Sequence, residues 1–484
     1  MIPQHVIIWT VFVLYLFFLL FVGFFAQRRF SKTYEDFVVA GKTLGKWVTA
    51  ISASASAESA WLILGLSGYG FVYGFGSYWI ALGGILGYWF NALFIISQLK
   101  KDTDKYNSLT ISDYIESKLG DKHHIFRILS AIIVTFFMTA YVVAQFTGSG
   151  KQLEGMGLAS YKVGVLIGGL MIAIYVILGG YAAVSYTDLI QGILMVFVLA
   201  VFPIIAIFII GGPLEFFKKA GELGLTHLWG PSEFSLFVLG FLIGEAIGIA
   251  FGYPGMPHVI IRYFTVKDVK EGKRAGLIAI LWGFFAYFGS CTLGIAGRVL
   301  VEMGKLSSPG DPEKILPLFV ITFLNPVLAG IVLSAVTAAI MSTADSQLMY
   351  SSTTILNDVY LILRGKRPQQ KFLILGTRLV ILILSLLALF FALVEVRFIY
   401  RFVLYAWSAL GSAFSPVIIL SLYYSKFNIY GAITCLITGP TITILWKDVF
   451  KLTKYLYELF PAFLISLFLG FLVSRISNKF LRRS

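Results

Sequence analysis

Four carboxylates lie within otherwise apolar segments of this chain: Glu58, Asp188, Glu245 and Asp345. An acidic residue at membrane depth is costly and usually functional, so each is a candidate for binding an ion or a polar group. The surroundings of Asp345 are also rich in hydroxyls. On a helix, Ser342, Asp345 and Ser346 would share one face.

Hydroxyl and carboxylate oxygens without a paired histidine or cysteine suit Na⁺ better than a transition metal. The five histidines are scattered and the two cysteines lie far apart, so no zinc spacing or histidine-based catalytic cluster is visible. This disfavours a membrane-embedded enzyme. Proton coupling stays open as an alternative to sodium, but the adjacent hydroxyls of Ser342 and Thr343 favour sodium.

The segments that contain Glu58 and Glu245 are not predicted to form continuous helices. Residues 51–61 alternate serine and alanine around Glu58, and residues 244–258 contain two prolines and four glycines. Proline removes a helix hydrogen bond and clashes with the preceding turn. Unwound backbone at membrane depth survives where it lines a cavity, and its carbonyls can then bind a cation.

The composition places the whole chain in a membrane. Of the 484 residues, 58% are hydrophobic and 13% charged, whereas soluble domains carry roughly a quarter charged residues. We count about thirteen apolar spans of roughly 20 residues, the length that crosses a bilayer core, and they include residues 188–211 and 315–344. The broken segments fall in spans two (46–72) and seven (234–257). An offset of five spans would invert one half relative to the other, as in inverted-repeat secondary transporters.

The net charge of +14 belongs to the loops between these spans. Such loops face the cytoplasm and anionic lipid, so a nucleic-acid partner is not expected. The apolar run 6–25 has spanning length and its Arg28 and Arg29 follow it, unlike a cleaved signal peptide. The basic stretches predict an outside N-terminus and a cytoplasmic C-terminus: 28–32, 99–125, 262–274, 364–371 and 475–483.

Several motifs carry a family resemblance. They are the run 52–68 with Ser59-Ala60-Trp61-Leu62, then 109–114, 179–188, Gly252-Tyr253 with Pro257-His258, 262–264, and 333–360 with Met341-Ser342-Thr343. In order and spacing they resemble the sodium/solute symporter family over about residues 5 to 440, and most of all the bacterial sodium/proline symporters.

The resemblance implies an all-α polytopic membrane protein with a LeuT-type five-plus-five inverted repeat. One extra helix would occupy residues 1–40 with the first cytoplasmic loop. The transport core would occupy 41–424, with repeats at about 41–212 and 230–424. Two C-terminal helices and a basic tail would fill 425–484.

The resemblance also implies binding sites. A main sodium site would use the carbonyls of Ala55, Glu58 and Ala339 and the hydroxyls of Ser342 and Thr343. A second sodium site would use Asp188, Ser342, Asp345 and Ser346. The substrate would lie near Ser59, Trp61, Tyr253 and Pro257, with Glu245 as a further candidate.

The expected activity is Na⁺-coupled symport of a small organic solute across the cell membrane by alternating access, with L-proline first among the solutes. No enzyme activity is expected, and no cofactor or metal other than Na⁺ as coupling ion. The expected partners are Na⁺, the solute and the lipid bilayer, and the chain is expected to act as a monomer.

Three positions keep other solutes open. The proline symporters commonly carry Asp, Trp and Gln where this chain has Ala57, Ile249 and Met256. Another amino acid, a monocarboxylate, pantothenate or a sugar is therefore an alternative substrate. A channel is disfavoured, because one chain with two broken helices offers neither a symmetric pore nor a filter motif.

Overall fold

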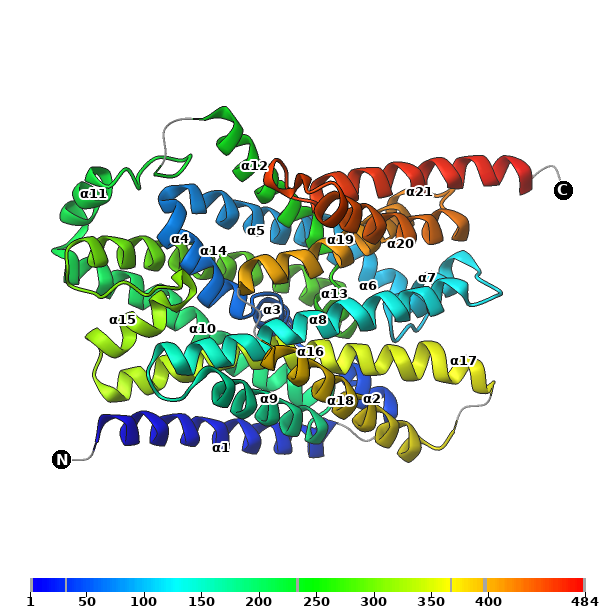
Figure 1. The fold of residues 1–484 in the computed structure, drawn as a ribbon. Helices are drawn as coiled ribbons and strands as arrows, with labels where there is room; N and C mark the ends of the chain where they lie inside the picture. Colours follow the sequence, from blue (N-terminus) through cyan, green and yellow to red (C-terminus); the bar gives the residue numbers. More distant parts are fainter. Residues whose placement is uncertain (1–2, 31–32, 232–234, 366–367, 395–397, 482–484) are drawn as a thin grey trace.

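The protein is an all-helical bundle, seen here in a computed structural model that describes residues 3–30, 33–231, 235–365, 368–394 and 398–481. Parts of three basic stretches, residues 31–32, 366–367 and 482–483, lie outside the described residues. Twelve helical stretches in the described part are long and apolar enough to cross a membrane. The two termini lie at opposite ends of the bundle (Figure 1).

One of these twelve stretches, residues 61–105, combines two of the predicted spans. The chain turns within it at Gly74, whose φ of +55° is a conformation that glycine adopts readily. A Cβ there would also lie 2.4 Å from the carbonyl oxygen of Leu225. Dividing the stretch at this turn agrees with the predicted total of about thirteen spans.

The first half of the bundle follows α1 (Gln4–Phe30) and the short α2 (Tyr34–Val39). Its helices are α3 (Lys46–Ala57), α4 (Ser67–Tyr73), α5 (Tyr78–Phe90), α6 (Ile96–Lys105), α7 (Ile111–Leu119), α8 (Ile125–Gly155), α9 (Tyr161–Leu178), α10 (Tyr181–Ile210) and α11 (Pro213–Glu222).

The second half begins after residue 235. Its helices are α12 (Leu236–Gly252), α13 (Pro257–Thr265), α14 (Val269–Glu302), α15 (Ile315–Phe323), α16 (Pro326–Thr354), α17 (Leu361–Arg364), α18 (Gln370–Leu393) and α19 (Ile399–Tyr423). Two more helices, α20 (Ile429–Ile444) and α21 (Leu459–Leu481), pack together beside α19.

Both broken spans are present. In the first, α3 ends before Glu58, whose φ of −104° and ψ of +71° are not helical, and the chain resumes as a π-helical turn leading into α4. In the second, α12 passes through a short 3₁₀ turn at Tyr253–Gly255, and Met256 is extended before α13 starts at Pro257. The serine-alanine run and the proline pair therefore mark the two breaks.

Two predicted span boundaries are wrong. The helix carrying Asp188 starts at Tyr181 rather than at residue 188, so Asp188 lies inside α10. The predicted span 315–344 is two helices, because the Asn325 side chain caps a new helix by accepting the N–H groups of Val327 and Leu328 at 3.1 and 3.0 Å. Asp345 consequently lies well inside α16.

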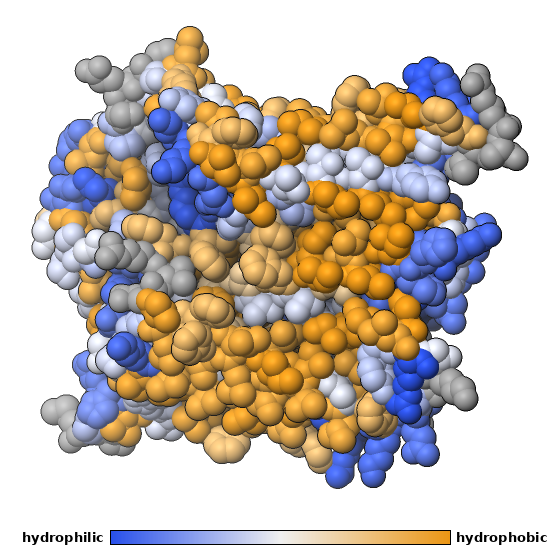
Figure 2. All heavy atoms as spheres, turned by 45° about the vertical axis from the view of Figure 1, so that its right-hand side comes forward, coloured by the Kyte–Doolittle hydropathy of each residue, from blue (hydrophilic) through white to orange (hydrophobic). Residues whose placement is uncertain are grey.

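The surface agrees with a lipid environment. A broad hydrophobic face covers the middle of the bundle, and hydrophilic residues gather toward its two ends (Figure 2). On α1, the side chains of Phe17 and Phe21 are 65% and 67% exposed. Such exposure of large apolar rings is unfavourable in water and favourable in lipid. The polar groups predicted to act are instead buried between the helices.

Candidate functional site

Residues of the predicted main sodium site meet where α16 contacts the end of α3. The Ser342 hydroxyl donates to the carbonyl oxygen of Ala55 at 2.9 Å, and Thr343 donates to that of Ser56 at 3.0 Å. Ser342 also lies 3.3 Å from the Ala339 carbonyl oxygen. All these groups are fully buried. Hydroxyl and carbonyl oxygens are the hard donors that Na⁺ takes, so the donor set fits that ion.

Four of the five predicted members of this site are thus linked by hydrogen bonds, since Ser342 contacts the carbonyls of Ala55 and Ala339 and Thr343 lies 3.4 Å from that of Ala55. The fifth, the Glu58 carbonyl, forms no hydrogen bond to Ser342 or Thr343 among the described residues. The structure adds the Ser56 carbonyl, which the sequence motifs did not single out. The unwound end of α3 explains why the Ser56 carbonyl is available, because the last carbonyls of a helix have no helical partner.

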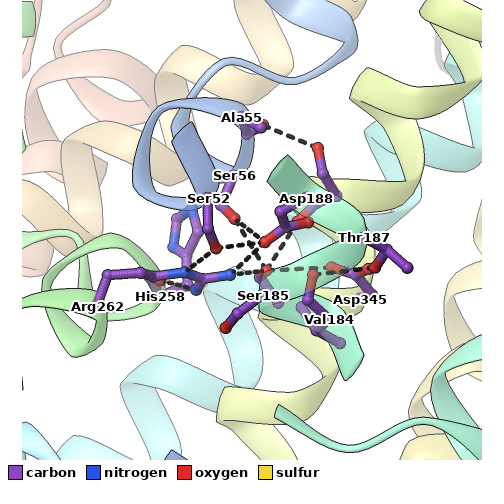
Figure 3. A network of polar contacts seen from close by, with 12 residues as sticks. Ser52, Ala55, Ser56, Val184, Ser185, Thr187, Asp188, His258, Arg262 and Asp345 are labelled. Atoms are coloured by element: carbon purple, nitrogen blue, oxygen red, sulfur yellow. Dashed lines mark hydrogen bonds and ion pairs between the residues drawn. The ribbon is translucent and has the colours of Figure 1, made fainter. Parts of the chain in front are cut away.

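A second polar network lies beside this site and centres on Asp188 (Figure 3). Its carboxylate forms an ion pair with Arg262 at 3.0 Å and accepts the hydroxyls of Ser52 and Ser56 at 2.6 and 3.3 Å. The Arg262 guanidinium also donates to Ser52 and Ser346. These side chains come from α3, α10, α13 and α16, so the network joins four helices at the bundle centre.

The predicted second sodium site falls within this network. Ser346 donates to the Ser342 carbonyl oxygen at 2.7 Å and lies 3.1 Å from Asp345 Oδ1. Its hydroxyl is also 3.0 Å from that of Ser56. One oxygen of each carboxylate, Asp188 Oδ1 and Asp345 Oδ2, is buried without a hydrogen-bond partner. Among the described residues Asp188 forms an ion pair with Arg262, whereas Asp345 forms none.

The assignment of Arg262 to a cytoplasmic loop was wrong. It lies in α13 and is fully buried, because its guanidinium pairs with Asp188. An unpaired carboxylate inside a span calls for a cation nearby, and this signal could have pointed to Arg262. Which basic residue met Asp188 depended on the packing of α13 against α3 and α16.

The side chain of Glu58 is held by a cage of three tyrosines, which sequence reasoning left incomplete. Its Oε1 accepts hydroxyls from Tyr88 at 3.0 Å, Tyr253 at 2.5 Å and Tyr287 at 2.8 Å. Tyr253 was a predicted substrate residue, whereas Tyr88 and Tyr287 were not singled out. We call these three residues the tyrosine cage.

Glycines make room for the tyrosine cage. A Cβ at Gly84 of α5 would lie 2.2 Å from the Tyr287 ring, and one at Gly87 would lie 2.1 Å from the Tyr253 ring. A Cβ at Gly283 of α14 would lie 2.8 Å from the Tyr88 ring. The rings therefore rest directly on helix backbone. The glycine spacing on α5 is the sequence signal that could have indicated this.

The predicted substrate residues lie at the two breaks. Trp61 lies 5.9 Å, centre to centre, from the Tyr287 ring, so it adjoins the tyrosine cage that contains Tyr253. The Ser59 hydroxyl accepts the backbone N–H of Trp61 at 3.3 Å and lies 3.4 Å from the Tyr141 hydroxyl of α8. Pro257 starts α13 directly after the second break. All four residues are buried.

Glu245 lies apart from the second break, within α12. Its two carboxylate oxygens accept hydroxyls from Tyr69 at 2.8 Å and Tyr400 at 3.2 Å. The rings of Tyr69 and Tyr400 stack at 4.7 Å, and Tyr400 lies 5.9 Å from Trp61. Glu245 therefore holds an aromatic stack that adjoins Trp61, and it does not contact Glu58.

Comparison with known proteins places this arrangement in a family. Residues 37–439 match the description of the sodium:solute symporter family. The chain belongs to this family. Among its relatives, the high-affinity proline transporter PutP of Bacillus subtilis is 34% identical over 462 residues, covering 94% of this chain and 95% of the relative. Sodium/proline symporter 2 of Staphylococcus saprophyticus is 31% identical, covering 96% of this chain and 92% of the relative.

Two solved structures of Na⁺-coupled and related transporters have a fold similar to that of this symporter. A substrate-bound, outward-open Na⁺-coupled sialic acid symporter aligns with a TM-score of 0.82 at 18% identity, covering 97% of each chain. MhsT in complex with L-phenylalanine aligns with a TM-score of 0.56 at 15% identity, covering 89% of this chain and 99% of that one. The expected LeuT-type fold is confirmed, and the family is one of transporters rather than enzymes.

Proposed function

We propose that this symporter carries L-proline into the cell, driven by Na⁺, through alternating access between the two broken helices. The observation that carries the sodium part is the contact of the Ser342 and Thr343 hydroxyls with carbonyls freed at the first break. The proline part is supported by relatives that match nearly the whole chain and are named proline transporters.

In this proposal the main sodium site comprises the carbonyls of Ala55, Glu58 and Ala339 with the hydroxyls of Ser342 and Thr343. Both hydroxyls now donate to carbonyls. When Na⁺ binds, they would turn their lone pairs toward the ion, and the ion would replace the lost hydrogen bonds. Ion binding would thereby join α16 to the end of α3, which is how it would favour one conformation.

A second Na⁺ is proposed beside Asp188, with Ser342, Asp345 and Ser346. The support is electrostatic: among the described residues only Asp188 of these two buried carboxylates forms an ion pair, with Arg262, and each of the two keeps an oxygen without a hydrogen-bond partner. Buried charge is stable only when it is paired. One monovalent cation would balance the remaining charge.

The proposed orientation has the N-terminus outside and the C-terminus in the cytoplasm of a multi-pass protein in the cell membrane. Figure 1 supports it, since α7 and α17, which border basic stretches, lie at the end that holds the C-terminus. Basic residues prefer the cytoplasmic side. We propose the monomer as the transporting unit.

Replacing Trp61 with alanine should weaken proline binding more than sodium binding. The indole follows the first break and packs between the rings of Tyr287 and Tyr400 at 5.9 Å each. Losing the indole should raise the KM for proline by about 10- to 100-fold, in line with the cost of truncating a buried aromatic contact. Initial uptake rates at varied proline and varied sodium would measure both affinities; an equal loss in the two would contradict the assignment.

The function itself is tested with purified protein in proteoliposomes and a panel of radiolabelled solutes. An inward sodium gradient should stimulate L-proline uptake, while equimolar potassium should not. A monocarboxylate, pantothenate and a sugar should show no stimulated uptake. Uptake driven equally well by a proton gradient without sodium, or a stronger signal for another solute, would refute the proposal.

A further inference from the structure

The Glu58 carboxylate connects the two helix breaks. It belongs to the first break, and one of its hydrogen-bond donors, Tyr253, belongs to the second. Another donor, Tyr287, touches Trp61. Any solute held between the breaks against Trp61 and Tyr253 would therefore lie next to this carboxylate.

The hydrogen bonds to the Glu58 carboxylate are unevenly distributed between its two oxygens. All three tyrosine hydroxyls donate to Oε1, while Oε2 is buried and has no hydrogen-bond partner. No lysine, arginine or histidine in the described part of the chain forms an ion pair with Glu58. Donors on one oxygen stabilise the negative charge but do not cancel it. A cation bound beside Oε2 would stabilise the charged form of this fully buried carboxylate.

Glu245 provides a useful contrast. It is equally buried and is also bound by tyrosines, but each of its two oxygens accepts one hydroxyl. Neither oxygen is left free. Both oxygens of Glu245 thus have a hydrogen-bond partner. Glu58, beside the proposed substrate region, keeps Oε2 as an acceptor without one.

We propose that Oε2 of Glu58 binds the positively charged nitrogen of the transported solute and so determines its class. This rests on the proposed function and deepens it. The tyrosine cage holds Oε1 in place, and the solute's N–H groups supply the missing donor and the missing charge. A zwitterion with a protonated nitrogen then fits. A solute whose only charged group is a carboxylate would place a second negative charge beside that of Glu58. A sugar would bring no positive charge, so Glu58 would remain unpaired.

The test compares L-proline with tetrahydrofuran-2-carboxylate, which has nearly the same shape but a ring oxygen in place of the protonated nitrogen. Competition against radiolabelled proline would be measured in proteoliposomes for wild type, Glu58→Gln and the matched control Glu245→Gln. Wild type should prefer proline by about 100-fold or more, because a site built for an N–H donor rejects an analogue that lacks it. Glu58→Gln should reduce this preference to within about threefold. Glu245→Gln should keep it.

The outcomes separate this inference from the proposed function. If wild type shows no sodium-stimulated proline uptake, the proposed function fails. If wild type transports proline but binds the oxygen analogue equally well, the inference fails without any variant being needed. It also fails if Glu58→Gln keeps the wild-type preference, or if that variant changes only the sodium concentration required for half-maximal uptake.

Discussion

Replacing both Ser342 and Thr343 with alanine is expected to lower sodium-stimulated uptake by at least about 100-fold at limiting sodium. The two hydroxyls contact the carbonyls of Ala55 and Ser56 at 2.9 and 3.0 Å in a region fully closed from water. A hydrogen bond or ligand contact to a charged group contributes about 1.5–3 kcal/mol, so losing two removes most of the affinity for the ion. Uptake as a function of sodium concentration would measure the change.

Helix α16, which carries Ser342 and Thr343, also contains a matched control pair. Ser352 and Thr353 are also adjacent and buried, but both hydroxyls donate to the Met349 carbonyl of their own helix. Their double alanine variant should keep the wild-type sodium dependence within about threefold, because each lost bond is a local one. Wild-type uptake at low sodium by the Ser342 and Thr343 variant would rule out the main sodium site.

Replacing Arg262 with methionine is expected to destabilise the protein by about 3–5 kcal/mol, the typical cost of removing one partner from a buried ion pair. The change would leave Asp188 and Asp345 together without a cation at the junction of α3, α10, α13 and α16. The midpoint of thermal unfolding in detergent would report the loss. A second change, Asp188→Asn, should restore much of the stability, since it removes the stranded charge.

An exposed pair on α14 provides the comparison. Arg298 and Glu302 are 2.8 Å apart, but their side chains are 40% and 41% exposed. Replacing Arg298 with methionine should cost less than about 1 kcal/mol, because water solvates the remaining carboxylate. If the Arg262 variant unfolds at the wild-type temperature, or if the double variant is less stable than the single one, Asp188 and Arg262 do not act as a coupled pair.

Local features made much of the fold predictable. Long apolar runs define spans because lipid requires them, and the proline pair at 254 and 257 and the serine-alanine run before Glu58 placed both breaks. The motif around Ser342 and Thr343 indicated the residues that now meet the end of α3. The boundary errors near Asp188 and Asn325 arose because hydropathy does not report where a helix cap lies.

What the sequence determined by itself is the membrane environment, the positions of the breaks and the family, since each depends on residues close together in the chain. The tertiary structure decided which groups meet. Arg262 could be read as a loop charge until α13 was packed beside Asp188. The tyrosine cage brings hydroxyls from α5, the second break and α14 onto one oxygen of Glu58. Such contacts depend on how the helices pack in three dimensions, and hydrophobic periodicity along one helix does not specify them.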